Sequence, residues 1–200
     1  SMRLLLESIH HEFKIKNSKF IADIFPIENE EIAKERLFEI QKREYNANHH
    51  CYAWRYFIGT NEYWRANDNG EPAGTAGKPI YSIISGANIT GIIAIVTRYF
   101  GGIKLGKGGL IRAYGQVVQE ALLSAETIPY LQKQELVVEV PFDLINLVFR
   151  LAEQFNAEIL KQEYNNNVTI ILAMEKKFID PFNWELFQLS NGKLKGRLLP

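Results

Sequence analysis

The most informative stretch of the sequence is Ile92-Ile-Ala-Ile-Val-Thr-Arg-Tyr-Phe-Gly-Gly-Ile-Lys-Leu-Gly-Lys-Gly-Gly-Leu-Ile-Arg-Ala-Tyr114. The apolar run at residues 92–97 predicts a buried strand, and the amphipathic pattern at residues 110–125 predicts a helix. Residues 98–114 contain five glycines, two lysines and two arginines. Glycine backbones can approach a ligand closely, and a helix that begins just after them directs free N–H groups at an anion. The stretch therefore predicts an anion-facing surface between a strand and a helix.

Charge is distributed unevenly along the chain. The 23 lysines and arginines balance the 23 aspartates and glutamates. This balance excludes a protein that coats nucleic acid through a general basic excess. Residues 72–119 nevertheless contain no acidic residue, and the bases that fall among them are Lys78, Arg98, Lys104, Lys107 and Arg112. Any anion binding is therefore expected to be local to this segment.

The composition is that of an ordinary soluble globular protein, with 46% hydrophobic and 23% charged residues. A single cysteine, Cys51, excludes an internal disulfide and is typical of a reducing compartment. The sequence shows neither a signal-peptide pattern nor the run of about 18 apolar residues that a membrane helix requires. We therefore expect a cytoplasmic protein without a membrane partner.

Hydrophobic periodicity predicts two domains, at residues 1–129 and 130–200. In the first we expect a hairpin at 13–24, a helix at 28–45, strands at 49–58 and 62–65, a Gly- and Pro-rich loop at 67–79, and a short helix to about residue 86. In the second we expect a strand at 135–140, a helix at 142–157, strands at 158–164 and 168–175, a helix at 181–190 and a strand at 193–199. This βαββαβ order is the ferredoxin-like arrangement.

The glycine stretch matches a phosphate-binding loop only in part. Gly101, four further residues and Gly106-Lys107 follow the Walker pattern between a predicted strand and a predicted helix. Gly108, however, stands where that pattern needs the Ser or Thr that binds magnesium, which disfavours nucleotide hydrolysis. Binding of phosphate groups in RNA or another polyanion is the favoured interpretation. The structural alternative is that the glycines allow tight packing of a loop on a sheet.

Two further groups of residues have side chains suited to chemistry. On a strand, His49 and Cys51 would face one way, as a thiol–imidazole pair or the start of a metal site. A buried thiol with hydrogen-bonded histidines is the favoured alternative, and we predict no metal site and no cofactor. Asp68, Glu71 and Thr75 lie on the Gly- and Pro-rich loop, where two carboxylates can do acid–base work or hold a cation. A structural role is favoured for them too, with Asp68 capping a turn and Glu71 paired with a base.

Long ordered motifs give the chain a resemblance to a known family. They are Asp68-Asn-Gly-Glu-Pro-Ala-Gly-Thr-Ala-Gly77, Val96-Thr-Arg-Tyr-Phe-Gly-Gly-Ile-Lys-Leu-Gly106 and Gly108-Gly-Leu-Ile-Arg-Ala-Tyr114, supported by Lys19-Phe-Ile-Ala22 and Ala47-Asn-His-His-Cys-Tyr-Ala53. Together these motifs resemble the YigZ/IMPACT family over nearly the whole chain.

The resemblance implies an α+β protein with two domains. The first, at residues 1–129, would be an Impact N-terminal-type β/α sandwich with the fold of a ribosomal protein domain. The second, at residues 130–200, would be a small ferredoxin-like βαββαβ domain similar to late domains of elongation factor G. Both folds recur in proteins that contact RNA or the ribosome, so the resemblance implies a translation-linked role by analogy of fold.

These observations lead to one favoured hypothesis and two alternatives. The favoured one is a non-enzymatic protein that binds RNA or the ribosome. Its predicted phosphate contacts are Arg98, Lys104, Lys107 and Arg112, with backbone access at Gly101, Gly102, Gly106, Gly108 and Gly109. The first alternative is an enzyme acting on a small phosphate compound or nucleotide with Asp68 or Glu71, and no catalytic residue is assigned. The second is a protein-interaction module that docks a partner through the second domain.

Overall fold

The computed structural model describes all 200 residues, and the chain divides into two compact units, Ser1–Tyr130 and Leu131–Pro200. Each unit combines helices with antiparallel sheet, which confirms the predicted α+β class. No helix in the chain has both the length and the apolar character that crossing a bilayer requires.

The first unit is built on a five-stranded antiparallel sheet with the order β2-β3-β7-β4-β5. Its strands are β2 (Ile9–Ile15), β3 (Ser18–Pro26), β7 (Ile92–Tyr99), β4 (His49–Ile58) and β5 (Asn61–Asn67). The apolar run predicted to be a strand is the central strand β7, which pairs with β3 on one side and β4 on the other. Residues 92–98 of β7 are all buried because both faces of the sheet are covered.

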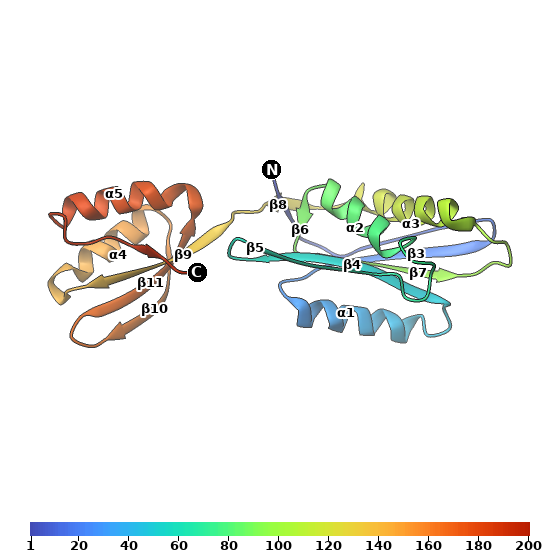
Figure 1. The fold of residues 1–200 in the computed structure, drawn as a ribbon, viewed down its shortest axis with the longest axis horizontal. Helices are drawn as coiled ribbons and strands as arrows, with labels where there is room; N and C mark the ends of the chain where they lie inside the picture. The colour runs from blue at the N-terminus through green and yellow to red at the C-terminus, as the bar shows by residue number, and fades with distance from the viewer. The chain divides into compact units, whose positions relative to one another are not determined.

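Helices cover the two faces of this sheet (Figure 1). They are α1 (Glu30–Arg43) on one face, and α2 (Gly77–Gly86) and α3 (Gly106–Leu122) together on the other. Successive side chains of a strand point to opposite faces. Ile93 and Ile95 therefore pack in the core under α1, while Ala94 and Val96 pack in the core under α2 and α3. This alternation makes β7 the wall between two hydrophobic cores.

The helix predicted at residues 110–125 begins and ends earlier than expected. It starts at Gly106, so residues 106–109 form the first turn of α3 rather than a loop. Glycine has no side chain and gives no hydrophobic periodicity, so the pattern becomes visible only at Leu110, which is buried. The basic glycine stretch therefore contains the N-terminus of a helix.

A small second sheet completes the first unit and was not predicted. It has the order β6-β1-β8, formed by β1 (Arg3–Leu5), β6 (Ile89–Thr90) and β8 (Thr127–Pro129). Strands of two or three residues are too short to show periodicity. Leu5 packs in the core under α2 and α3, and the Arg3 Nε group donates a hydrogen bond of 2.7 Å to the Thr127 hydroxyl. The sheet thus fixes the first residues of the chain to the segment that precedes residue 130.

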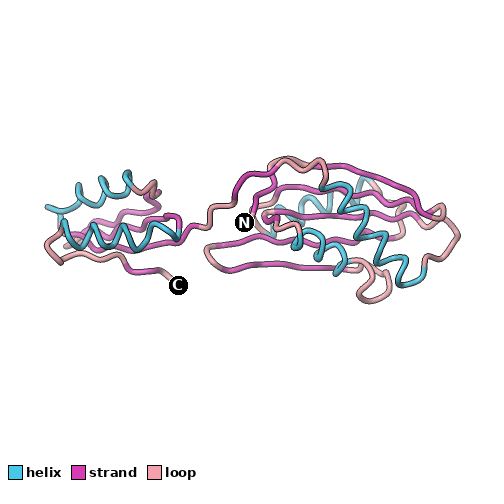
Figure 2. The backbone as a smooth tube through the Cα atoms, turned by 90° about the horizontal axis from the view of Figure 1, so that it is seen from above, coloured by secondary structure: helices cyan, strands magenta, loops and turns pink.

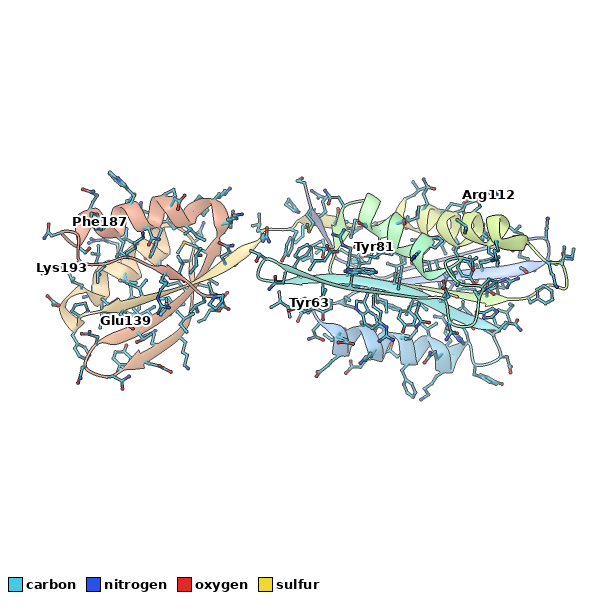
Figure 3. All side chains as sticks on the ribbon, in the orientation of Figure 1. Tyr63, Tyr81, Arg112, Glu139, Phe187 and Lys193 are labelled. Carbon is cyan, nitrogen blue, oxygen red and sulfur yellow. The ribbon has the colours of Figure 1, made fainter.

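The second unit has the predicted βαββαβ order. Its elements are β9 (Lys133–Val140), η1 (Phe142–Leu144), α4 (Ile145–Gln154), β10 (Glu158–Tyr164), β11 (Val168–Glu175), η2 (Lys176–Phe178), α5 (Ile179–Leu189) and β12 (Arg197–Leu198). The sheet order is β10-β11-β9-β12. Figure 2 shows the helices and strands of this unit along the backbone. Residues of α4 and α5 share one hydrophobic core with inward-facing strand residues. Glu139 of β9 is exposed instead (Figure 3).

Candidate functional site

A cavity of about 380 Å³ lies between the start of α3, the carboxyl end of β7 and the loop at residues 68–76. Its volume falls in the range of about 300–1,000 Å³ that small-ligand sites occupy. The residues that line it are Glu71, Pro72, Arg98, Phe100, Lys104, Leu105, Gly106, Lys107 and Leu110. The fold therefore brings predicted anion-contact residues together with the predicted loop residue Glu71. The sequence analysis gave no role to Phe100, Leu105 or Leu110, whose apolar side chains also face this cavity.

Asp68 shapes the loop that borders the cavity. One carboxylate oxygen accepts from the backbone N–H of Gly74 at 2.9 Å, and the other accepts from Ala76 at 3.0 Å and Gly77 at 2.8 Å. Burial tends to raise the pKa of Asp68, but these three N–H groups outweigh it and lower the pKa. Ala76 and Gly77 are the N-cap and first residue of α2, so Asp68 caps this helix from the preceding loop.

Glu71 projects from this loop into a buried ion pair. Its carboxylate is 2% exposed, and Oε1 accepts a hydrogen bond of 2.7 Å from the Arg98 guanidinium. The same oxygen lies 2.7 Å from His49 Nε2. Glu71 therefore links the loop to His49 of strand β4 and Arg98 of strand β7.

The buried ion pair adds no net charge to the cavity. The charges of Glu71 and Arg98 cancel each other. His49 Nδ1 lies 2.8 Å from the Asn69 carbonyl oxygen, which can only accept, so Nδ1 is the donor. The net positive charge of the cavity lining therefore comes from Lys104 and Lys107.

Arg98 is not a free surface cation. Its side chain is 7% exposed, and its guanidinium lies 5.8 Å from the ring centroid of Phe20 and 5.4 Å from that of Phe100. Its first partner is a carboxylate of its own chain, which differs from the direct phosphate contact that we expected. A buried cation–carboxylate pair of this kind is costly to break, because removing one charge leaves the other uncompensated.

Two buried polar atoms in the cluster lack any partner. They are Glu71 Oε2, an acceptor, and Arg98 Nε, a donor. An unsatisfied buried polar group costs about 1–3 kcal/mol. Both atoms have less than 1 Å² of accessible surface, so neither is open to a ligand in the cavity.

The predicted glycines fall into three groups. A Cβ on Gly101 would lie 2.1 Å from the backbone carbon of Asn17, so Gly101 is needed for close packing on the β2–β3 turn. Gly102 and Gly106 have φ of +88° and +72°, a conformation that favours glycine. Gly108 and Gly109 lie in the first turn of α3. The tight-packing alternative therefore explains Gly101, and a Cβ on Gly109 would also lie only 3.1 Å from that of Leu105. A Cβ on Gly102 or Gly106 would meet no atom within 4 Å, so the backbone just before α3 is open.

The start of α3 offers hydrogen-bond donors to the cavity. No side chain caps this helix, and its first turn contains no acidic residue. The first N–H groups of a helix have no partner within the helix, and its dipole places partial positive charge there. Lys104 and Lys107 are exposed beside this end and line the same cavity. These groups together make up a local cationic site.

Arg112 does not belong to this site. It is exposed on α3 (Figure 3). It borders a wider groove of about 650 Å³ between α2 and α3, together with Ile83 and Gln119. Its predicted role as a phosphate contact therefore has no support from the cavity.

Cys51 of β4 and Thr75 of the loop itself make hydrogen bonds that hold the loop in place. The Cys51 thiol donates to the Asp68 carbonyl oxygen at 3.1 Å, and burial raises its pKa to about 12. A thiol with so high a pKa stays protonated and is a poor nucleophile. The Thr75 hydroxyl donates to the Pro72 carbonyl oxygen at 2.5 Å and is 1% exposed. Both residues therefore support the loop and do not face the cavity.

The other three histidines do not line the cavity. His10 contacts Asp23 at 2.7 Å, His11 contacts Glu120 at 2.8 Å, and His50 Nε2 lies 2.9 Å from the Glu44 carbonyl oxygen. Nowhere in the chain do three or more His, Cys, Asp or Glu side chains group as a metal ion requires.

Comparison with known proteins shows which family the chain resembles. Residues 16–122 match the Impact N-terminal domain, and residues 138–193 match a domain of unknown function, DUF1949. The chain is 39% identical over 189 residues to an IMPACT family member of Haemophilus influenzae, covering 94% of this chain and 92% of that protein. It is 32% identical over 185 residues to the IMPACT family member YigZ of Escherichia coli, covering 91% and 90%.

A solved structure has the same fold over both units. The crystal structure of a hypothetical protein superposes with a TM-score of 0.77 and 29% sequence identity, covering 100% of this chain and 97% of the other. The family model, the similar relatives and the matching fold together confirm the resemblance to the IMPACT family that the sequence motifs indicated. The chain belongs to the IMPACT family.

Proposed function

We propose that this protein binds RNA, free or in the ribosome, and that it does so without catalysis by holding a backbone phosphate at the start of α3. The observation that carries the proposal is the uncapped N-terminus of α3, which opens into a cavity flanked by Lys104 and Lys107. Helix N-termini bind phosphate through their free N–H groups and dipole. Lysines beside such a site add the point charges that phosphate contacts use.

The charge of the surroundings supports an anionic ligand. Residues 72–119, which supply α2, β7 and all but the last turn of α3, contain no Asp or Glu. The one carboxylate in the cavity lining, that of Glu71, is paired with Arg98, so Lys104 and Lys107 leave the lining with net positive charge. A phosphate therefore meets net positive charge despite the neutral total of the chain.

The choice of RNA rests on the family expectation. Both domain types that the resemblance implies recur in proteins that contact RNA or the ribosome, which supports a translation-linked role by analogy of fold. The local character of the cationic site fits a protein that holds one or a few phosphates of a larger assembly, rather than one that coats a long strand.

Binding to single-stranded RNA and to ribosomal subunits at low and moderate salt tests the proposal. Each phosphate contact to a single strand contributes a slope of about −0.7 in log K against log salt concentration. We expect Lys104→Ala and Lys107→Ala each to weaken binding and to flatten this slope by about 0.7. Lys34→Ala is the matched control, because Lys34 is an exposed lysine of α1 on the opposite face of the sheet.

The lysines at the cavity are better test sites than Arg98, because their exposed side chains can be removed without opening the core. Equal binding by the wild type and both cavity variants at low salt contradicts the site. Absence of RNA and ribosome binding even at low salt contradicts the function itself.

A further inference from the structure

Strand β5 is an open edge of the five-stranded sheet. It stands last in the order β2-β3-β7-β4-β5 and pairs only with β4. Its residues 61–65 are exposed, and no backbone hydrogen bond from another loop or helix reaches residues 61–67. The outer side of β5 is therefore available for pairing with a further strand.

The turn before β5 determines which of its backbone groups are free. Ile58 and Asn61 flank a two-residue turn and are paired with each other. The residues that flank such a turn are hydrogen-bonded, and hydrogen-bonded pairs then alternate with non-bonded pairs along the strands. The odd-numbered residues of β5 therefore bond to β4. The backbone N–H and C=O groups of Glu62, Trp64 and Ala66 point away from the sheet.

Strand β5 lacks the features that protect the other outer strands of the chain. Natural sheet edges are protected by lysines, prolines, bulges or short length. Strand β2 contains Lys14, β12 has only two residues, and β10 has a register shift between Ile159 and Lys161. By contrast, β5 has seven residues without lysine or proline and pairs with β4 without a shift.

The two charged side chains of β5 are engaged within their own chain. The Glu62 carboxylate accepts hydrogen bonds of 3.0 Å from Arg55 Nε and 3.0 Å from the Tyr81 hydroxyl. The Arg65 guanidinium lies 5.8 Å from the ring centroid of Trp54. Both charges are thus placed over the faces of the sheet, and the edge itself presents mainly backbone.

Two aromatic rings flank this edge, one on each face of the sheet. Tyr63 is 46% exposed and stacks on Tyr56, with 5.4 Å between ring centroids, on the face that α1 covers (Figure 3). Trp64 is 56% exposed and lies 4.6 Å from the ring of Tyr81 in α2, on the other face. Tyr and Trp are enriched in protein interfaces. Rings already held by stacking lose little side-chain freedom when a partner binds.

The strand is complementary to itself in one antiparallel register, with Trp64 on a two-fold axis. All seven residues are then paired, and the outward-pointing backbone groups of one strand meet those of the other. The opposed pairs are Asn61 with Asn67, Glu62 with Ala66, Tyr63 with Arg65, and Trp64 with itself. No like charges are opposed, and the Tyr63 ring faces a cation. With Arg65 on the axis two like charges would be opposed, and with Tyr63 there residues 66 and 67 would have no strand partner.

We infer that β5 is a dimerisation strand, which pairs with β5 of a second copy of this chain about a two-fold axis at Trp64. The residue-for-residue match of the strand with itself favours a second copy over an extended segment of another protein. The two five-stranded sheets then form one continuous sheet. The inference is independent of the proposed function, because no residue of β5 lines the cavity at the start of α3.

The mass of the full chain in solution gives the first test. In sedimentation equilibrium we expect the mass to rise with concentration from 23.0 kDa to twice that value and no further, because a two-fold contact closes. Trp64→Lys opposes two like charges at the axis and should weaken the dimer by about tenfold or more. Trp184→Lys is the matched control, because Trp184 is 66% exposed on α5 of the second unit, and it should dimerise as the wild type does.

Disulfide formation tests the register. Trp64→Cys places two thiols on the axis, where the Cα atoms of a hydrogen-bonded pair are about 5.5 Å apart, within the range of about 4.4–6.8 Å that a disulfide spans. The native Cys51 is buried and does not compete. Under oxidation Trp64→Cys should form a covalent dimer, whereas Trp184→Cys should remain largely monomeric on a non-reducing gel.

Each contrary result overturns the inference. One is a mass of a single chain at every concentration, and another is a dimer that Trp64→Lys leaves as stable as the wild type. A mass that grows beyond two chains also contradicts it, since pairing of β5 with a different edge makes open chains. Equal cross-linking of Trp64→Cys and Trp184→Cys places the contact elsewhere. The cross-linking comparison decides the question even if Trp64→Lys does not fold.

Discussion

The buried side chain of Glu71 is paired with Arg98 of β7. Arg98→Ala removes its principal cation and leaves the carboxylate 2% exposed without that partner. Breaking a buried pair in this way costs about 3–5 kcal/mol in free energy of unfolding. We expect this loss in urea unfolding followed by circular dichroism. Arg112→Ala removes an exposed arginine of the same segment and should change stability by less than about 0.5 kcal/mol.

A double substitution separates the loss of a pair from the loss of packing. Replacing a buried ion pair by apolar residues of similar volume is often neutral or stabilising. Arg98→Leu combined with Glu71→Leu should therefore be more stable than Arg98→Ala alone. If Arg98→Ala unfolds at the same urea concentration as Arg112→Ala, the pair contributes nothing and this account of the cluster is wrong.

The sequence predicted the members of this cluster but not their pairing. Spacing placed Glu71 on a loop, where pairing with an unnamed base was the favoured alternative. Arg98 is 27 residues away, and strand periodicity cannot tell which base a loop acid will reach. Arg98 was expected to contact phosphates at a surface because of its charge, whereas its side chain is 7% exposed and paired with Glu71.

At the scale of elements, the loop at residues 68–76 and the helix α2 depend on one carboxylate. Asp68→Ala removes the acceptor of three backbone N–H groups. Loss of a helix cap costs about 0.5–2 kcal/mol. Because the same loop positions Glu71, we also expect weaker RNA binding. Asn29→Ala is the matched control, since Asn29 caps α1 through the N–H of Ile32 and should lose similar stability while binding RNA normally.

The same carboxylate makes stability depend on pH. Its pKa is lowered in the folded chain from an ordinary value of 3.8, so the folded state holds the Asp68 proton less tightly than the unfolded state. Its contribution is therefore fully present above pH 3.8 and is lost as pH falls through the folded pKa. The difference in unfolding free energy between wild type and Asp68→Asn should shrink as pH is lowered from about 5 to about 2. A difference that is constant over this range contradicts the capping role.

Helices and strands were predicted correctly where the pattern of side chains shows a clear periodicity. Strand β4 at 49–58 and strands β10 and β11 have the predicted bounds, because alternating or branched residues fill them. The start of α3 was missed by four residues because residues 106, 108 and 109 are glycine. That error affects the site directly, since the predicted loop is the helix N-terminus itself.

At the scale of the whole molecule, each of the two units has a hydrophobic core of its own. Residues 131–200 enclose one core between a four-stranded sheet and two helices. Domains of about 55–65 residues and above can fold alone. We therefore expect the fragment 131–200 to unfold cooperatively in urea, with a transition that matches one phase of the full chain.

The division also determines where RNA binding should reside. The cavity, both of its lysines and the start of α3 belong to residues 1–130. The fragment 1–130 should therefore bind RNA with the affinity and salt slope of the full chain, because the number of phosphate contacts sets the slope. The fragment 131–200 should show no RNA binding at the same salt concentration. If the second fragment binds RNA and the first does not, although both are folded by circular dichroism, the functional surface lies in the ferredoxin-like unit and the α3 site has another ligand.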